Sequence, residues 1–493
     1  MSMASLIVTA ALLVAVLVAS LARTEGRRRT AGFAAVWPTG VAAVIAAAGL
    51  SHEVLTRGDI AGASLTVLVA VLTLVVQVFA DRHLRGDPRA RAFFALSALV
   101  AAGSTVAVSA DGVVLLAGGW TVATAGMIGL IGTGGRGPQT RASVRRAALA
   151  LGVGDAALWL AVAVTITTIG SGELADLENL RGAPAVAVGV LVAVAAIARA
   201  GSFPLHTWLA ATAATTTPAS ALLHAGFVNA GALLLLRFAE VPSVIGPWIV
   251  GVAGGITLLA AAVAMRTRPD VKGRLVQSTA AQMGFMLLAC GIGAFGVALV
   301  HVLGHALFKA SLFLGAGSAV ERAIALRSAP TAPRSRGGSA AAAGAVIVVG
   351  AAVILLGGAV AHTSAVLLLF VVATAALAGA RLGGATSPLG IRALLVALVA
   401  GAVVGYVLVV ARGAEALAPV APAAALSPLF ALAVFVVASV LALVSFTSGR
   451  AADAVFAFAF AWGRSPLPAP ARTSDVTTPP TAARGPLEYG RLS

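Results

Sequence analysis

Apolar runs of about twenty residues, the length of helix that crosses the hydrocarbon core of a membrane, recur along almost the whole chain. Of the 493 residues, 60% are hydrophobic and only 10% are charged, so most of the chain has no polar face to turn toward water. The pattern predicts an all-α polytopic membrane protein with about 14–15 transmembrane helices. The expected spans, with ends uncertain by a few residues, are 3–22, 31–50, 60–80, 91–109, 112–132, 148–170, 183–203, 219–239, 243–265, 274–292, 295–318, 342–361, 364–381, 393–412 and 427–447.

The placement of the basic residues decides whether the net charge of +16 indicates nucleic-acid binding or membrane topology. Arginines cluster after the first, third and fifth expected spans, whereas the loops between these clusters are acidic or nearly uncharged. This alternation follows the positive-inside rule and predicts a multi-pass plasma-membrane protein with its amino terminus outside and its carboxyl terminus in the cytoplasm. We therefore expect no nucleic-acid partner.

Cysteine usage bears on the chemistry that the chain can carry. Its only cysteine, Cys290, lies inside an apolar span. One cysteine cannot form a disulfide within the chain or supply the roughly four thiolates of an iron–sulfur cluster. We expect no cofactor, no metal site and no catalytic residues, so the chain is not expected to be an enzyme by itself.

Composition divides the chain into five segments. Residues 1–90 are expected to form amino-terminal transmembrane helices, and 91–320 a core that carries the polar residues. Residues 321–341 are a basic linker rich in Pro, Ser and Gly on the cytoplasmic side. Residues 342–447 are almost purely Ala, Val, Leu and Gly and are interpreted as scaffold helices. Residues 448–493, rich in Ala, Pro, Arg and Thr, are expected to be a disordered cytoplasmic tail.

One row of ionisable residues stands out, because such residues are costly at membrane depth and are functional candidates by default. The sequence HVLGHALFK places His301, His305 and Lys309 four residues apart, within an arc of about 80° and a rise of about 12 Å on one helix. Histidine titrates near neutral pH, and a lysine removed from water releases its proton more readily. The row predicts a proton relay; the alternative is a pair of core histidines with a lysine that extends to the cytoplasm.

Lysine usage supports the relay. Arginine serves nearly every basic position, and the only two lysines are Lys272 and Lys309. A lysine can release its proton, whereas an arginine keeps it. Lys272 begins a span, so it is interpreted equally as a proton-pathway residue or as a positive-inside anchor, with Asp270 as its candidate partner.

A second group of residues predicts a broken helix. Pro204 and Pro218, together with the threonines at 215–217, interrupt an apolar helical region. A break at membrane depth is tolerated where protein or an internal water path satisfies the freed backbone groups. His224, after the break, is expected to face that path. For His224 and for His206, a hydrogen-bonded structural histidine is the alternative.

Two further charged residues lie within apolar surroundings. Arg199 needs an acidic or polar partner. Asp155 is the only carboxylate well inside the early spans, so it is expected to pair with Arg199 or with Lys309. A helix-capping role is the alternative for Asp155.

Four segments, PLHTWL, TTTPASALLHAGFVNAG, DVKGRLVQSTAAQMGF and HALFKASLFLGAGS, together resemble the large antiporter-like subunits of respiratory complex I, Mrp antiporters and membrane hydrogenases. The resemblance covers about residues 90–320. It implies two inverted helical repeats, each with a broken helix, and a central hydrophilic axis that conducts protons. The matching positions on or beside that axis are Asp155, Arg199, His224, Lys272, His301, His305 and Lys309.

The chain departs from the complex I subunits at several positions. Thr121 follows Trp120 where those subunits carry a glutamate, and Arg199 stands where they carry a lysine, five residues before Pro204. The second block lacks their later lysine, and the tail is too short and too rich in proline for their long lateral helix. These losses, with the run from Asp270 to Ser318, make the chain most similar to DabB, the membrane subunit of a two-component inorganic carbon accumulation system.

This similarity implies a subunit that conducts protons or sodium ions and couples the ion gradient to CO2 and bicarbonate accumulation. Its implied partner, on the cytoplasmic side, is a zinc protein similar to DabA, which resembles a carbonic anhydrase. The alternatives are a proton-translocating subunit of an NADH-quinone oxidoreductase or related redox complex, a free-standing cation/proton antiporter, and a structural scaffold.

Overall fold

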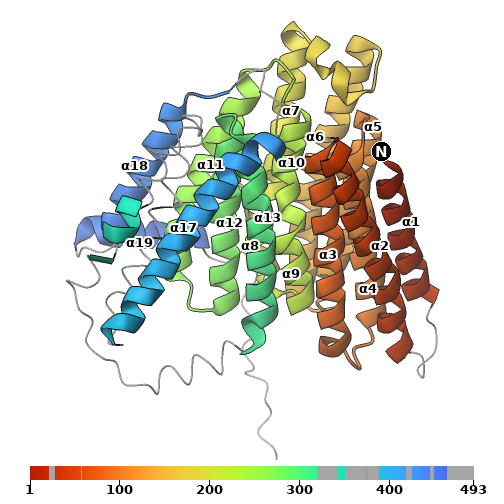
Figure 1. The fold of residues 1–493 in the computed structure, drawn as a ribbon, viewed down its shortest axis with the longest axis horizontal. Helices are drawn as coiled ribbons and strands as arrows, with labels where there is room; N and C mark the ends of the chain where they lie inside the picture. Colours follow the sequence, from red (N-terminus) through yellow and green to blue (C-terminus); the bar gives the residue numbers. More distant parts are fainter. Residues whose placement is uncertain are drawn as a thin grey trace, which may run out of the picture.

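The computed structural model describes residues 1–21, 28–56, 58–318, 341–342, 344–349, 372, 375, 388–417, 425–444 and 449–463. Within these residues the protein is a bundle of helices, and its only β pairing is an isolated bridge between Gly112 and Glu173 (Figure 1). In this part of the chain, 11 helices are long and apolar enough to cross a membrane, which confirms the all-α polytopic class. The expected linker and the spans 342–361 and 364–381 lie largely outside the described residues.

The helices follow one another with short connections. The long ones are α1 (Met3–Leu21), α2 (Arg28–Thr56), α3 (Ile60–His83), α4 (Ala90–Ser109), α5 (Val113–Gly132), α6 (Pro138–Ile169), α7 (Gly182–Ala200), α11 (Ile245–Ala264), α12 (Val271–Gly291), α13 (Phe295–Leu314), α17 (Leu389–Leu417), α18 (Pro428–Val444) and α19 (Arg450–Gly463). The short ones are η2 (Leu174–Asn179), α8 (Thr207–Ala211), η3 (Thr212–Ala214), α9 (Thr217–Ala225), η4 (Phe227–Asn229), α10 (Ala230–Arg237), η5 (Met265–Thr267) and η6 (Gly315–Ser318).

The two ends of the bundle differ in charge. One end, here called the acidic face, carries Asp59 before α3, Asp111 before α5 and Glu173 before η2. The loops at this end touch one another, since Arg237 pairs with Asp59 and Gly112 bridges to Glu173. The opposite end carries the loops 84–89 and 133–137, which hold Arg85, Arg89 and Arg136 beside one acidic residue, Asp87, and is called the arginine face. Successive loops of antiparallel helices lie at opposite ends of the bundle, so the acidic loops gather at one end and the basic loops at the other, as the sequence predicts.

Helices α4 and α5 approach each other closely through paired glycines. A Cβ atom built on Gly119 would lie 2.6 Å from the carbonyl oxygen of Gly103 and 2.7 Å from the amide nitrogen of Ala107. Small residues allow this contact between backbones, which drives helix association where there is no water to provide a hydrophobic effect. The neighbouring Gly118, by contrast, has open space at the same position.

Gly119→Ala is therefore expected to lower the stability of the bundle by about 1–3 kcal/mol, because the added methyl group must push two backbones apart. The matched variant Gly118→Ala adds the same methyl group to the same helix without a contact, and alanine favours helix, so its stability should not fall. Thermal unfolding in mild detergent measures both. Equal melting temperatures for the two variants would contradict the close approach of α4 and α5.

The helical region is interrupted where the prolines and threonines predict, at residues 201–206 around Pro204 and at Thr215 and Thr216. Pro218 lies in the first turn of α9, directly after the second interruption, where its missing amide hydrogen costs nothing. A further break, which was not predicted, follows His224: α9 ends at Ala225, and η4 and α10 continue the span after Gly226. A Cβ on Gly226 would meet Leu72 Cδ2 at 2.8 Å, so a residue without a side chain suits this turn.

The carboxyl-terminal segment contains a helix where a disordered tail is expected from composition. Helix α19 (Arg450–Gly463) lies against α11, and Arg268 Nη1 donates to the carbonyl oxygen of Gly463 at 3.0 Å. The ring of Trp462 stacks on His206, with centroids 4.1 Å apart. The small residues Ala459 and Gly463 are the buried positions of this helix, whereas Phe456, Phe458 and Phe460 remain about half exposed. Residues 464–493 lie outside the described part of the chain.

Candidate functional site

Helix α13 carries the predicted row, and its neighbours hold each member by a different contact. Lys309 is completely buried, and its Nζ donates to Ser278 Oγ on α12 at 2.8 Å and to the carbonyl oxygen of Leu275 at 3.4 Å. Among the described residues, no carboxylate lies within ion-pairing distance of Lys309. A buried ammonium group without an opposite charge is costly, so this position favours a lysine that gives up its proton.

His305, one turn before Lys309, faces oxygen atoms with both of its ring nitrogens. Nδ1 lies 2.5 Å from Gln282 Oε1, and Nε2 lies 3.0 Å from the carbonyl oxygen of His224. A carbonyl only accepts, so Nε2 carries a hydrogen, whereas a glutamine amide can present either its oxygen or its NH2 group. His305 can therefore keep both hydrogen bonds in its charged and in its neutral form.

The break after α9 makes the contact between His224 and His305 possible. The carbonyls at a helix carboxyl terminus have no partner within the helix. Here side chains satisfy two of them: His305 Nε2 bonds the carbonyl oxygen of His224, and Asn229 Nδ2 donates to that of Ala225 at 2.7 Å. The irregular backbone thus provides an acceptor for the row at membrane depth.

Lys272 belongs to the same connected group. Its Nζ donates to the carbonyl oxygen of Thr215 at 2.7 Å, and Thr215 Oγ1 donates to the carbonyl oxygen of Thr212 at 2.8 Å. Thr212 Oγ1 lies 3.3 Å from Nε2 of His224, whose ring is fully buried and stacks on Phe313. Polar groups thus run from Lys272, near the arginine face, through the loop before α9 to His224, and the backbone carbonyl of His224 joins them to His305.

Arg199 occupies the core between α5, α6 and η4, with 2% of its surface exposed. Its guanidinium carbon lies 3.7 Å from the ring centroid of Trp120 and 4.1 Å from that of Phe227, so the cation is held between two aromatic faces. Nη2 donates to Thr124 Oγ1 at 2.7 Å and to the carbonyl oxygen of Trp120 at 3.1 Å. Stacking and the flat guanidinium explain why an arginine, rather than a lysine, suits this position.

Asp155 on α6 lies beside Arg199 and not beside Lys309. Its Oδ1 is 3.8 Å from Arg199 Nη2 and accepts a hydrogen bond from Thr124 Oγ1 at 3.0 Å. Of the two pairings expected for this carboxylate, the structure shows the one with Arg199. Thr121, where complex I subunits carry a glutamate by resemblance, instead accepts a hydrogen bond from Trp159 Nε1 at 2.9 Å.

His301 is the member of the row with the weakest polar contacts. Its Nδ1 lies 3.4 Å from the hydroxyl of Tyr406 on α17, and its buried Nε2 has no hydrogen-bond partner among the described residues. Its ring centroid is 6.0 Å from that of His305. Helix α17 packs against α13, and among the described residues its polar contact with the row is made by Tyr406.

The structure connects Lys272, His224 and His305 through polar groups and separately pairs Asp155 with Arg199, and it adds residues that the sequence analysis did not single out. Ser278 and Gln282 of α12 hold Lys309 and His305. They are four residues apart, as are the residues they contact, and this polar spacing inside an apolar helix is a signal that could have found them. Tyr406 carries no comparable signal. Among the residues described, no three His, Cys, Asp or Glu side chains gather as a metal site.

Comparison with known proteins identifies relatives of this arrangement. Residues 110–330 match the family described as "NADH:quinone oxidoreductase/Mrp antiporter, TM". The probable inorganic carbon transporter subunit DabB1 of Halothiobacillus neapolitanus is 35% identical over 273 residues, which cover 52% of this chain and 48% of the relative. NADH-quinone oxidoreductase subunit L of Escherichia coli is 34% identical over 275 residues, which cover 52% of this chain and 44% of the relative. The chain thus spans about half the length of the curated relatives it matches.

The solved structures include a protein of similar fold. A chain in the structure of the Mrp complex from Dietzia sp. DQ12-45-1b superposes with a TM-score of 0.62 at 25% sequence identity. The superposition covers 92% of this chain and 59% of that chain. The helices in the described part of the chain are thus arranged as in that chain of the Mrp complex.

Proposed function

We propose that this protein conducts ions across the membrane, because residues 110–330 match the family described as "NADH:quinone oxidoreductase/Mrp antiporter, TM". The ions are protons or sodium ions, and the gradient drives accumulation of inorganic carbon, CO2 and bicarbonate, together with a DabA-like zinc protein. The observation that carries the proposal is the burial of Lys309 with a hydroxyl and a carbonyl, and no described carboxylate, as its polar partners.

The geometry supports a proton relay along α13. Lys309 can pass a proton toward Ser278, and His305 can change its protonation while Gln282 and the carbonyl of His224 remain in contact. His224 and Lys272 extend the polar groups on either side of the broken span. The roles of Asp155, Arg199, His224, Lys272, His301, His305 and Lys309 in this pathway are part of the proposal.

Two observations favour coupling to inorganic carbon. The relative DabB1 is named as a probable inorganic carbon transporter subunit. The site also replaces the charge pattern expected of complex I subunits: Thr121 follows Trp120, Arg199 takes the position of a lysine, and Asp155 supplies the nearby carboxylate from α6. Such a change in the charged groups beside Arg199 fits a subunit that serves a different partner.

A second candidate function is proton translocation within an NADH-quinone oxidoreductase or related redox complex. Subunit L of the Escherichia coli enzyme matches a nearly equal stretch of the chain at nearly equal identity. Because Cys290 is the only cysteine of the chain, electron transfer through iron–sulfur clusters would have to reside in other subunits.

Charge separation supports an orientation in the plasma membrane. The arginine face would lie in the cytoplasm and the acidic face outside, with the amino terminus outside and the carboxyl terminus inside. The DabA-like partner would then bind at the arginine face, on the side where α19 stacks Trp462 on His206.

Affinity purification of the tagged chain from membranes in mild detergent, followed by mass spectrometry and metal analysis, tests the proposal. We expect one large zinc-containing protein to co-purify in a fixed ratio. Flavin and iron–sulfur subunits in its place would assign the chain to a redox-driven complex. Sodium- or proton-dependent flux by the chain alone in proteoliposomes, with no co-purifying protein, would establish a free-standing antiporter. This result would overturn both the carbon-transporter function and the redox-complex function.

A further inference from the structure

Two cavities lie near each other between the acidic face and Arg199. The first, of about 200 Å³, opens among α1, α2, α3 and the loop before α5, and its polar lining includes Glu53, Asp59 and Asp111. We call it the vestibule. The second, of about 70 Å³, has mostly apolar walls and reaches Arg199, and we call it the inner cavity. Because one water molecule needs about 10–15 Å³, the inner cavity has room for several.

Consecutive residues form the walls of the two cavities. On α3, Leu65 lines the inner cavity and Thr66 lines the vestibule; on α4, Val108 and Ser109 do the same. The inner cavity continues along α4 from Val108 to Val100, a distance of about 12 Å at the rise of a helix. It therefore covers much of the depth between the acidic face and the centre of the bundle.

Buried polar groups without partners indicate that the inner cavity holds a polar ligand. Arg199, with 2% of its surface exposed, and Asn229, with 5%, both line this cavity. Arg199 Nε and Asn229 Oδ1 have no hydrogen-bond partner among the described residues. A donor and an acceptor left unpaired in the lining of one cavity are best satisfied by water.

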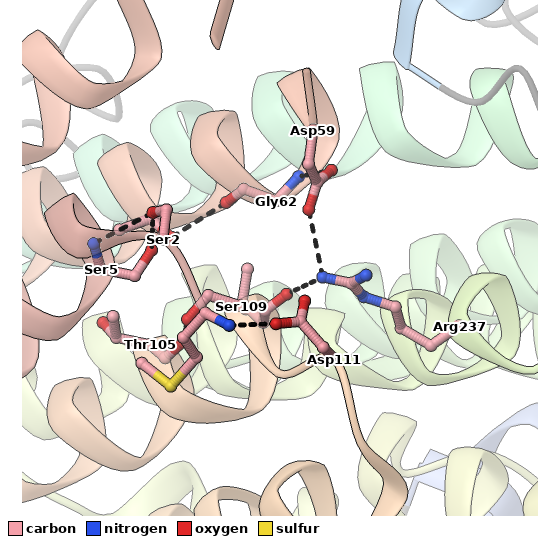
Figure 2. Close-up of polar contacts among 11 residues, drawn as sticks. Ser2, Ser5, Asp59, Gly62, Thr105, Ser109, Asp111 and Arg237 are labelled. Atoms are coloured by element: carbon pink, nitrogen blue, oxygen red, sulfur yellow. Dashed lines mark hydrogen bonds and ion pairs between the residues drawn. The ribbon is translucent and has the colours of Figure 1, made fainter. Parts of the chain in front are cut away.

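Arg237 stands at the boundary between the cavities. It is the last residue of α10, one turn after Leu233, which lines the inner cavity. Its Nη2 lies 3.3 Å from Asp59 Oδ2 and donates to the carbonyl oxygen of Val108 (Figure 2). One guanidinium group thus ties together α3, α4 and α10, three of the helices that line the inner cavity.

We propose that the vestibule and the inner cavity form the route by which a small cation reaches Arg199 from the acidic face, and that Arg237 is its gate. The acidic side chains of the vestibule, of which Asp111 is paired with the amino-terminal ammonium group of Met1, attract cations. The positive charge of Arg237 repels them while its bonds to Asp59 and to the carbonyl oxygen of Val108 hold. Release of Arg237 joins the vestibule to the water-sized inner cavity. This inference rests on the proposed ion conduction for its purpose, but the route itself can be tested without transport.

Cysteine accessibility to silver ions provides that test. Silver is a small monovalent cation that binds thiolates, and Cys290 is the only cysteine, so Cys290→Ala supplies a background without thiols. Ala107→Cys and Ala101→Cys place a thiol in the inner cavity on α4. Ala102→Cys is the matched control, because Ala102 is equally buried on the same helix but lines neither the inner cavity nor the vestibule. Silver is applied from the acidic face, and the remaining thiols are counted with a maleimide after denaturation.

In the presence of Arg237, both cavity thiols should react slowly with silver ions. Arg237→Ala should raise the rate of this reaction by about tenfold, which corresponds to a free-energy difference of about 1.4 kcal/mol at 25 °C. Ala102→Cys should stay protected in both backgrounds. Asp59→Asn can still cap α3 but no longer forms an ion pair with Arg237, so it should give an intermediate rate of reaction with silver. It replaces Arg237→Ala as the test variant if Arg237→Ala does not fold.

Unchanged rates at both cavity thiols in folded Arg237→Ala and Asp59→Asn protein would overturn the route. Rates that are already high with Arg237 present, and equal in its absence, would overturn its role as the gate. Proton and sodium flux in proteoliposomes is measured in parallel. Silver access that opens without any ion flux in any variant would support the route while contradicting the proposed ion conduction, so the two failures can be distinguished.

Discussion

Lys309→Ala should abolish ion-coupled transport, with a loss of at least about 100-fold, while the protein still reaches the membrane. The reason is that no other described side chain can replace its Nζ between Ser278 and the carbonyl of Leu275, and loss of a proton-transfer group typically costs about 10²–10⁴-fold in rate. Lys309→Arg should fail as well, because a guanidinium keeps its proton. Proton flux in proteoliposomes containing the complete complex measures the loss.

Leu307→Ala is the matched control for Lys309. Leu307 lies on the same helix with 61% of its surface exposed on the outside of the bundle, so its truncation should leave flux nearly unchanged. Normal flux in Lys309→Ala would remove the relay and leave α13 with a structural role. Equal losses in Lys309→Ala and Leu307→Ala would show that the assay reports damage to the helix and would also contradict the relay.

Asp155→Ala should lower the free energy of unfolding by about 3 kcal/mol, because it leaves the buried guanidinium of Arg199 without an opposite charge. Asp155→Asn should cost less, since its amide oxygen can still accept the hydrogen bond from Thr124. Adding Arg199→Met to Asp155→Asn should restore part of the loss, because the uncompensated charge is then gone. Thermal unfolding in detergent measures the series.

The pair Asp81 and Arg85 is a matched control at the same separation. Their charged atoms are also 3.8 Å apart, but both side chains are partly exposed near the arginine face. Asp81→Ala should change stability by about 0.5 kcal/mol or less, as is usual for an exposed ion pair. If Asp155→Ala and Asp81→Ala cost the same, the Asp155–Arg199 pair does not stabilise the core, and its place in the pathway must rest on transport data alone.

Features that depend on residues near one another in sequence were accessible before the structure. The apolar runs predicted the helical membrane class, and the spacing of His301, His305 and Lys309 predicted their common face on one helix. The alternation of charged loops predicted that Asp59 and Asp111 share one end of the bundle. Each of these follows from the 3.6-residue repeat and from the length of a helix, which are local properties of the chain.

Local patterns missed one break in the second group of residues. The prolines and threonines predicted the interruptions around Pro204 and at Thr215 and Thr216, which the structure shows. The break at Gly226 depends on the close approach of Leu72 from α3 and on the side chains of His305 and Asn229, which satisfy the freed carbonyls. None of these contacts is visible within the broken segment itself.

The sequence by itself therefore determined the class of the protein, the residues that can carry charge inside it, and the end of the bundle at which each loop lies. Only the tertiary structure decided that Asp155 pairs with Arg199 and not with Lys309, that Gln282 and Ser278 hold the row, and that Arg237 contacts both Asp59 and the carbonyl oxygen of Val108. The physical reason is that partners on different helices meet according to the crossing and axial shift of those helices. These depend on close contacts such as that between Gly103 and Gly119, which lie far from the charged residues they bring together.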